Sequence, residues 1–279
     1  MTDHPLSTIE FEDELKQRRL YSHSVGICSE KRERTKYKGK VWYAQWAGSA
    51  SALMWGSHKF IFTAKHLVKG LSVADLRLWF CPVGPELTER ERNGCNASEL
   101  GSEFIECSWE DLAILPVTKT TGLYPEFHDV YLKWIDPKVR QALFSVGFPT
   151  DLAQVVRKDK VMTPHGELPH EYREITTYVW ESRRIRAPRG FRPRLTDDIP
   201  YNPNRHYLAS WDFPMTLGPF GYSGAAMWKL EFVPIPVIKL DLHFAGVPTH
   251  FYQKPHAIER IIKASVVRKF LEETFGPAQ

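Results

Sequence analysis

Three separated strings of residues supply a histidine, an aspartate and a serine, in that order along the chain. They are Thr63-Ala64-Lys65-His66, Asp111-Leu112-Ala113-Ile114-Leu115 and Gly221-Tyr222-Ser223-Gly224-Ala225. Together these side chains are the parts of an activated hydroxyl nucleophile: a serine, a base that accepts its proton and a carboxylate that orients the base. We therefore predict acyl-transfer chemistry, with His66, Asp111 and Ser223 as the catalytic residues.

The local context of the histidine and of the aspartate suits these roles. His66 follows the β-rich run Lys59–Thr63, and the small Ala64 lets the histidine turn pack against the strands. Asp111 opens an apolar strand, where burying a carboxylate is costly unless it is hydrogen-bonded. A hydrogen bond from an imidazole N–H would satisfy it and fix the tautomer of the base. Glu110 is an adjacent alternative, but it lacks the Asp-Leu-Ala-aliphatic context.

The serine lies in a glycine-rich string that suits a nucleophile. Gly221 permits a positive φ, so the backbone N–H groups of Gly221 and Ser223 can converge on one point. Two converging N–H groups form an oxyanion hole, which stabilises a tetrahedral intermediate. Gly224 and Ala225 are small, so the strand that follows can pack closely beneath the serine.

The elements that position these residues are predicted to be short strands. Twenty prolines, 17 glycines and 13% aromatic residues among 279 favour strands and turns over a helical bundle. The β-rich runs between Val41 and Val117, and a second set between Tyr131 and Pro248, predict two closed β-barrels. We expect a mainly β protein in four parts: an N-terminal extension (1–40), a first barrel (41–122), a second barrel (123–254) with an arginine-rich insertion at 172–203, and a C-terminal helix (255–279).

Helices are expected at the two ends of the chain. Ser7 and Glu10 form a capping-box pattern before the charged run at 11–18, which predicts a short N-terminal helix. Pro255 suits the first turn of the C-terminal helix. The apolar residues on one face of that amphipathic helix are Ile258, Ile261, Ile262, Val266, Phe270 and Leu271.

The chain resembles the chymotrypsin-fold (trypsin-like) serine peptidases, of the bacterial type that has no signal peptide. The three strings above and Val146-Gly147-Phe148-Pro149 carry the resemblance, which covers roughly residues 41–252. It implies two six-stranded antiparallel barrels packed at an angle, with the active site in the groove between them. By motif match it makes His66 the general base, Asp111 the orienting acid and Ser223 the nucleophile, with the amides of Gly221 and Ser223 as the oxyanion hole.

Three positions depart from the family pattern. Animal digestive members have an aspartate directly before the serine, which pairs with a newly cut N-terminus; Tyr222 stands there in this chain. Activation by such a cleavage is therefore not expected. Lys65 stands where the family usually has a small residue before the histidine, and Ala225 stands where it usually has a glycine. Neither change removes a catalytic atom.

The resemblance also predicts residues of the S1 pocket, which binds the substrate side chain that precedes the cleaved bond. These are Leu217, Gly218, Thr249, His250 and Phe251. They include no acidic residue, so a preference for arginine or lysine is not predicted. Thr249 and His250 suit an acidic or amide side chain, whereas Leu217 and Phe251 suit an apolar one.

The expected partners follow from charge and from the predicted chemistry. We predict a serine endopeptidase that acts on proteins or peptides and is controlled by a regulatory protein partner. The segment Arg183–Arg194 contains six arginines and Phe191, a composition that suits phosphates, an acidic protein surface or a solvated loop. Nucleic acid is an alternative partner, although a net charge of +4 does not require one. The alternative functions are a catalytically silent binding or scaffold module, and an esterase on the same scaffold.

Several classes of protein and site are not expected. The sequence contains no run of about 18 apolar residues, so no membrane span is predicted. Residues 1–19 lack the features of a secretory signal, so a cytoplasmic protein is expected. The four cysteines show no close pairing and are expected to be free thiols, with Cys95 and Cys107 as the alternative metal or redox pair. The predicted chemistry needs no cofactor and no metal.

Overall fold

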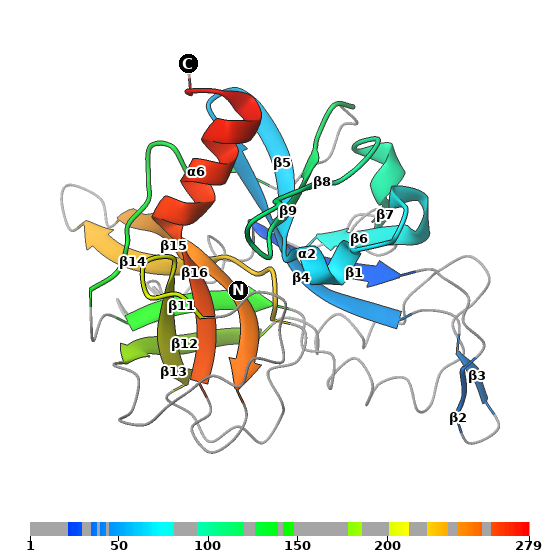
Figure 1. Ribbon diagram of the computed structural model, residues 1–279, viewed down its shortest axis with the longest axis horizontal. Helices are drawn as coiled ribbons and strands as arrows, with labels where there is room; N and C mark the ends of the chain where they lie inside the picture. Colours follow the sequence, from blue (N-terminus) through cyan, green and yellow to red (C-terminus); the bar gives the residue numbers. More distant parts are fainter. Residues whose placement is uncertain are drawn as a thin grey trace, which may run out of the picture.

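Two β-structures lie side by side, and a C-terminal helix packs against both (Figure 1). The computed structural model describes residues 22–29, 35–37, 40–42, 45–80, 94–119, 126–138, 142–147, 178–185, 201–211, 222–233, 239–252 and 258–278. The N-terminal helix predicted at 7–18 lies outside these residues. Within them, no helix has the length and apolar character needed to cross a membrane.

The first β-structure is an eight-stranded sheet built around the long strand β4. The path of hydrogen-bonded neighbours is β7-β6-β1-β4-β5-β9-β8, and β10 adds to β4 in parallel. The strands are β1 (Ser24–Ser29), β4 (Gln45–Trp55), β5 (His58–Thr63), β6 (Leu76–Phe80), β7 (Cys95–Asn96), β8 (Ile105–Glu106), β9 (Ala113–Pro116) and β10 (His128–Asp129). Two 3-10 turns, η1 (Val73–Asp75) and η2 (Ala97–Glu99), flank β6 and β7, and β2 (Thr35–Tyr37) pairs separately with β3 (Lys40–Trp42).

Alternation along β5 shows why this sheet is buried on both faces. Phe60 and Phe62 pack into the core that contains the C-terminal helix, whereas Ile61 packs into a second core on the opposite face. Successive strand residues point to opposite faces, so an apolar run of this kind requires cover on both sides.

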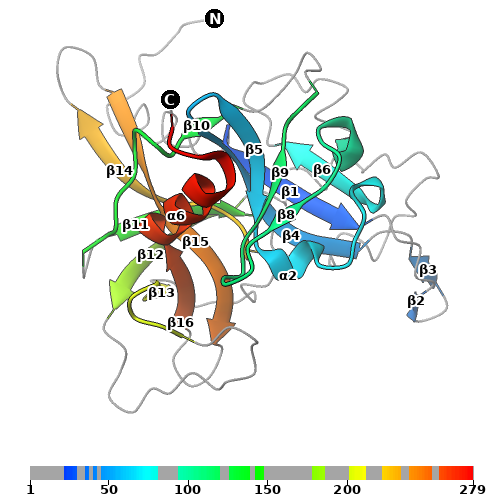
Figure 2. The same ribbon diagram turned by 45° about the horizontal axis from the view of Figure 1, so that its top comes forward.

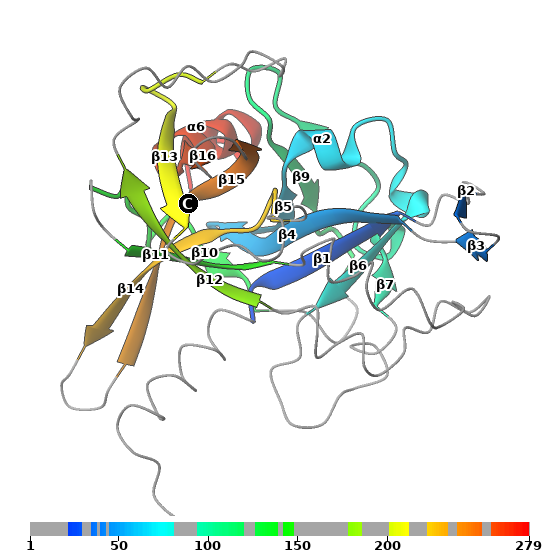
Figure 3. The ribbon, with the colours of Figure 1, turned by 90° about the horizontal axis from the view of Figure 1, so that it is seen from below.

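The second β-structure is a closed six-stranded barrel with the order β11-β12-β13-β16-β15-β14. Its strands are β11 (Ala142–Gly147), β12 (Tyr178–Ile185), β13 (His206–Trp211), β14 (Met227–Val233), β15 (Lys239–Tyr252) and β16 (Ile258–Lys263). Further views show it beside the first sheet, and β11 is the barrel strand that contacts both β1 and β4 (Figure 2, Figure 3). A small buried cluster includes Leu143, Tyr207, Ala209, Met227, Ala245 and Ile261.

The predicted architecture is confirmed in its main features: a mainly β protein with two packed antiparallel β-structures and a C-terminal helix. The first structure was expected to be a closed six-stranded barrel, but over the described residues its eight strands form a sheet whose order does not close, and the two-residue strands β7, β8 and β10 belong to it. It also begins at β1, inside the segment 1–40 that the sequence analysis set apart as an extension.

The start of the C-terminal helix was predicted wrongly. The helix α6 covers Ala264–Phe275, and the residues Ile258–Lys263 before it form β16. The isoleucines at 258, 261 and 262 fit a helical face, but β16 pairs with both β13 and β15 and closes the barrel. The branched side chains of isoleucine suit such a doubly paired strand.

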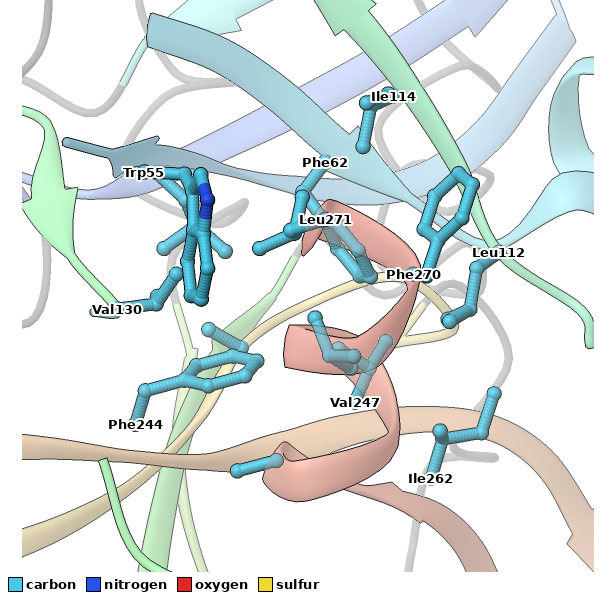
Figure 4. Close-up of a cluster of buried hydrophobic side chains, with 14 of the residues drawn as sticks. Trp55, Phe62, Leu112, Ile114, Val130, Phe244, Val247, Ile262, Phe270 and Leu271 are labelled. Carbon is cyan, nitrogen blue, oxygen red and sulfur yellow. The ribbon is translucent and has the colours of Figure 1, made fainter. Parts of the chain in front are cut away.

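Helix α6 fixes how the two β-structures are joined. Its buried residues are Ala264, Val266, Val267, Phe270 and Leu271. Side chains from both structures surround them: Figure 4 labels Phe62, Leu112 and Ile114 from the first and Phe244, Val247 and Ile262 from the second. The indole N–H of Trp55 also donates to the carbonyl oxygen of Gly276, at 2.9 Å. One shared apolar core therefore holds the ends of strands from both structures in fixed positions.

Candidate active site

Neighbouring strands bring His66 and Asp111 together. β5 and β9 are antiparallel, and Thr63 at the end of β5 pairs with Ala113 at the start of β9. His66 lies three residues beyond Thr63, in the short helix α2 (Lys65–Val68), and Asp111 lies two residues before Ala113. The backbone N–H of Lys65 donates to the carbonyl oxygen of Asp111 at 3.3 Å, which extends the pairing past the strand ends.

Asp111 holds His66 by two hydrogen bonds. The backbone N–H of His66 donates to Oδ1 of Asp111 at 2.9 Å, and Nδ1 of the imidazole lies 2.6 Å from Oδ2. An ionised carboxylate only accepts, so Nδ1 carries the ring proton and Nε2 is left as the basic nitrogen. The His66 side chain is 46% exposed, so this basic nitrogen belongs to a ring that solvent can reach.

Asp111 is ionised although it is buried. Burial alone would raise the pKa of its carboxyl, since the residue is 7% exposed. The hydrogen bonds from the ring and backbone of His66, together with the charges of His66 and Arg260, nevertheless hold the pKa of Asp111 below its usual value. The carboxylate therefore remains available to orient the imidazole at neutral pH.

Ser223 lies in a turn that is hydrogen-bonded to both β-structures. The backbone N–H of Ser49 on β4 donates to the carbonyl oxygen of Ser223 at 3.2 Å, and the N–H of Gly224 donates to the carbonyl oxygen of Pro248 on β15 at 2.9 Å. Gly224 has φ +87°, and a Cβ atom there would lie 2.8 Å from the backbone N of Ala64. The serine turn is thus packed against the residue two positions before His66.

The hydroxyl of Ser223 takes a different partner from the imidazole. Its Oγ lies 3.5 Å from the carbonyl oxygen of Thr249, to which it donates. Among the residues that the structure describes, no hydrogen bond joins Ser223 Oγ to His66. The base and its carboxylate are assembled, and the serine lies beside them with its hydroxyl turned to β15.

Comparisons with known proteins agree with this architecture. No protein-family model matches the chain, and no curated protein matches it in sequence. Among solved structures, a scabies mite inactivated protease paralogue aligns with a TM-score of 0.55 at 10% identity, over 95% of this chain and 96% of that one. Kallikrein-related peptidase 10 aligns with a TM-score of 0.51 at 9% identity, over 92% of this chain and 97% of that one. Human heparin binding protein aligns with a TM-score of 0.51 at 10% identity, over 94% of this chain and 96% of that one. The chain has a chymotrypsin-like fold.

Within this chymotrypsin-like fold, several predicted site residues lie outside the described ranges: Gly221, Leu217 and Gly218. The oxyanion hole and that part of the S1 pocket stay predictions. Thr249 is buried, with its hydroxyl close to Arg260, while His250 is half-buried and only the backbone of Phe251 is described. The arginine-rich segment is described only as the backbone of 183–185, within β12.

Two features near the site were missed by the sequence analysis. Arg260 is 2% exposed and donates to the Thr249 hydroxyl, and Glu110 is fully buried against His206. Signals for both exist in the sequence: an arginine inside the apolar run Ile258–Ile262, and two consecutive carboxylates before an apolar strand. Cys95 and Cys107 are buried thiols, and the described residues contain no cluster of three metal-binding side chains.

Proposed function

We propose that this chain is a serine endopeptidase that uses His66, Asp111 and Ser223. The observation that supports this most is the pair formed by His66 and Asp111, in which the carboxylate accepts from both the backbone and the ring of the histidine. This pair fixes one tautomer and one ring orientation, which a general base requires. The serine turn packs against the same strand end, and the fold is one that peptidases use.

In the proposed mechanism, Ser223 rotates its hydroxyl from Thr249 toward Nε2 of His66. Oγ then attacks a peptide carbonyl while the imidazole accepts its proton, and Asp111 stabilises the imidazolium that forms. The amides of Gly221 and Ser223 would stabilise the oxyanion. The imidazolium protonates the leaving amine, and a water molecule activated by the same imidazole hydrolyses the acyl-enzyme.

A fluorophosphonate probe tests this proposal, because it reacts with a serine whose proton is removed by a base. We expect labelling of the wild type and none of Ser223→Ala or His66→Ala. Ser102→Ala, at an exposed serine, is the matched control and should label like the wild type. Labelling of Ser223→Ala at the wild-type rate, or no labelling of a folded wild type, would contradict the proposal.

A second candidate function is a catalytically silent binding module. The hydrogen bond from Ser223 Oγ to the Thr249 carbonyl favours it, since an unready serine would be held in this way. One of the similar structures is a protease paralogue described as inactivated. Catalytic hydrogen bonds are often long in the absence of substrate, so the present geometry is compatible with both functions. Digestion of a peptide library would separate them, because only the peptidase yields cleaved products.

A further inference from the structure

A buried hydroxyl on the first β-structure contacts the backbone of the serine turn (residues 222–226). Ser51 lies on β4 and is 1% exposed. Further along the same face of this strand, Leu53 and Trp55 pack into the apolar core that both β-structures share. A hydroxyl group is costly to bury at such a place unless it has a hydrogen-bond partner. Ser51 therefore needs a specific partner.

The partner of Ser51 is the backbone of Ala226, whose N–H donates to Oγ of Ser51 at 2.7 Å. Ala226 is 1% exposed, lies three residues after Ser223 and directly precedes β14. A buried backbone N–H without an acceptor is rare in folded proteins, because it loses its hydrogen bond to water and gains none in return. A side chain of the first β-structure thus satisfies a backbone group of the segment that enters the second.

A second hydrogen bond joins β4 to the same turn. The backbone N–H of Ser49 donates to the carbonyl oxygen of Ser223 at 3.2 Å. Ser49 and Ser51 are two residues apart on β4, and their partners Ser223 and Ala226 are three residues apart. With one of these contacts the turn could still pivot about a single point. Two contacts fix both its position and its direction against the strand.

The strand that holds the turn is also paired with the strand that leads to the base. Ser51 on β4 is opposite Phe62 on β5, and β5 ends at Thr63, three residues before His66. The base therefore moves with β4, whereas Ser223 lies in the segment that leads into the barrel. Without an anchor on β4, a small shift of the barrel would change the separation between the hydroxyl of Ser223 and the imidazole. Small displacements of this kind are costly for catalysis.

We propose that Ser51 is a positioning residue for the candidate nucleophile: its hydroxyl fixes the serine turn to the sheet that carries His66 and Asp111. This inference rests on the proposed peptidase function. Ser51 acts through the backbone of Ala226 and not on the reacting atoms. Its loss should therefore slow reaction at Ser223 more than it weakens substrate binding.

The test compares the full-length wild type with Ser51→Ala and Ser51→Thr at a temperature at which each protein is folded. The measurements are the rate of labelling by the fluorophosphonate probe, and kcat and KM for a peptide ester. Alanine removes the acceptor, so the labelling rate and kcat should fall at least about tenfold while KM changes by less than about twofold. Threonine keeps the hydroxyl and suits a strand, so it should restore both rates to within about threefold of the wild type. A threonine variant as slow as the alanine variant would count against the proposal.

Two control variants separate positioning from a general loss of stability. Ser145→Ala removes a buried hydroxyl of β11 that has no hydrogen-bond partner among the described residues, so it should label like the wild type. Val130→Ala opens a cavity in the shared core, so it should lower the midpoint of urea unfolding and still label at nearly the wild-type rate. Wild-type labelling of Ser51→Ala, or an equal loss of labelling in Val130→Ala, would overturn the inference.

Amide hydrogen exchange tests the role of Ser51 without turnover. In Ser51→Ala, exchange of the Ala226 N–H should become at least about tenfold faster, and so should that of the Ser49 N–H, whose acceptor is in the loosened turn. A wild type that neither labels nor cleaves the ester contradicts the proposed function, whereas unchanged exchange at Ser49 in Ser51→Ala refutes the positioning role. If the alanine variant does not fold, Ser51→Cys replaces it, because a thiol is only a weak acceptor.

Discussion

Glu110 and His206 form a buried pair that joins the two β-structures one residue before Asp111. Both oxygens of the fully buried Glu110 carboxylate lie near Nε2 of His206, at 3.1 and 3.2 Å. Nδ1 of His206 accepts from the backbone N–H of Asn202 at 2.9 Å, so the ring proton is on Nε2 and points at Glu110. Nη1 of Arg205 adds a contact to Glu110 at 3.3 Å and donates to the carbonyl oxygen of Trp109 at 2.9 Å.

This pair predicts that Glu110→Ala is strongly destabilising. Burial raises the pKa of Glu110, but the hydrogen bonds from His206 and Arg205 hold it below its usual value, so the carboxylate is charged and fully paired. Its loss leaves the buried N–H of His206 without an acceptor, which should cost about 3 kcal/mol in the free energy of unfolding measured with urea. Glu106→Ala, at an exposed glutamate of the neighbouring strand, should change it by less than about 0.5 kcal/mol. Equal effects of the two substitutions would refute the role of the pair.

Asp111→Asn should leave the fold intact and greatly reduce turnover. Oδ2 of Asp111 accepts from the imidazole and Oδ1 accepts from the backbone of His66, and an amide can satisfy only one of these donors. The imidazole would then adopt the other tautomer, and kcat/KM should fall about 10,000-fold, the loss typical of this substitution in a Ser-His-Asp triad. Asp241→Asn, which affects a partly exposed ion pair with Lys133, should keep nearly full activity. A loss of less than about tenfold in Asp111→Asn would argue against the proposed orienting role.

Gly224→Ala should abolish labelling of Ser223 by the fluorophosphonate probe, because it displaces the serine turn without removing any catalytic side chain. Its φ of +87° favours glycine, and an added Cβ would lie 2.3 Å from the carbonyl oxygen of Ser49 and 2.5 Å from Oγ1 of Thr63. The serine turn would have to move away from the first sheet, and unfolding should become easier by more than about 3 kcal/mol. Gly70 is a matched control: φ is +74° but no atom lies within 4 Å of an added Cβ. Gly70→Ala should cost only about 1–2 kcal/mol and should still label; full labelling of Gly224→Ala would disprove the packing argument.

The sequence predicted the parts of the site that short, contiguous motifs specify, namely the positions of His66 and Asp111 at the ends of strands. His66 follows one strand and Asp111 precedes another, and the two strands are antiparallel neighbours, so adjacency of the strand ends was enough to bring them together. The direction of the Ser223 hydroxyl was not predictable in this way. It depends on a side-chain rotamer and on the bulge at Thr249, and neither has a local signature in the sequence.

The end of the chain shows a second limit. The isoleucines of Ile258–Lys263 satisfy the spacing of a helix face, and only pairing with β13 and β15, which are distant in sequence, makes the segment a strand. The burial of Arg260 depends on this correction. On a helix its side chain would have been assigned to solvent, whereas on the doubly paired strand it is buried and reaches the hydroxyl of Thr249.

The buried Glu259, also on β16, predicts that the stability of the protein falls as the pH rises. Glu259 is 3% exposed, its Oε2 atom has no hydrogen-bond partner, and burial raises the pKa of its carboxyl to about 8 from an ordinary 4.5. The folded protein therefore keeps Glu259 protonated while the unfolded chain releases that proton above pH 4.5. Stability is fully present below about pH 4.5 and is lost as the pH rises toward 8.

Glu259→Gln should remove this loss, because an amide cannot ionise in the unfolded chain. The variant and the wild type should unfold at similar urea concentrations near pH 4, and the variant should be more stable by roughly 4 kcal/mol near pH 8. Glu272→Gln, at an exposed glutamate of α6, provides the control and should follow the wild type at every pH. If stability changes with pH in the same way in Glu259→Gln and the wild type, the prediction is wrong. Glu259 would then be ionised in the folded protein as in the unfolded chain, so folding would not change the number of bound protons.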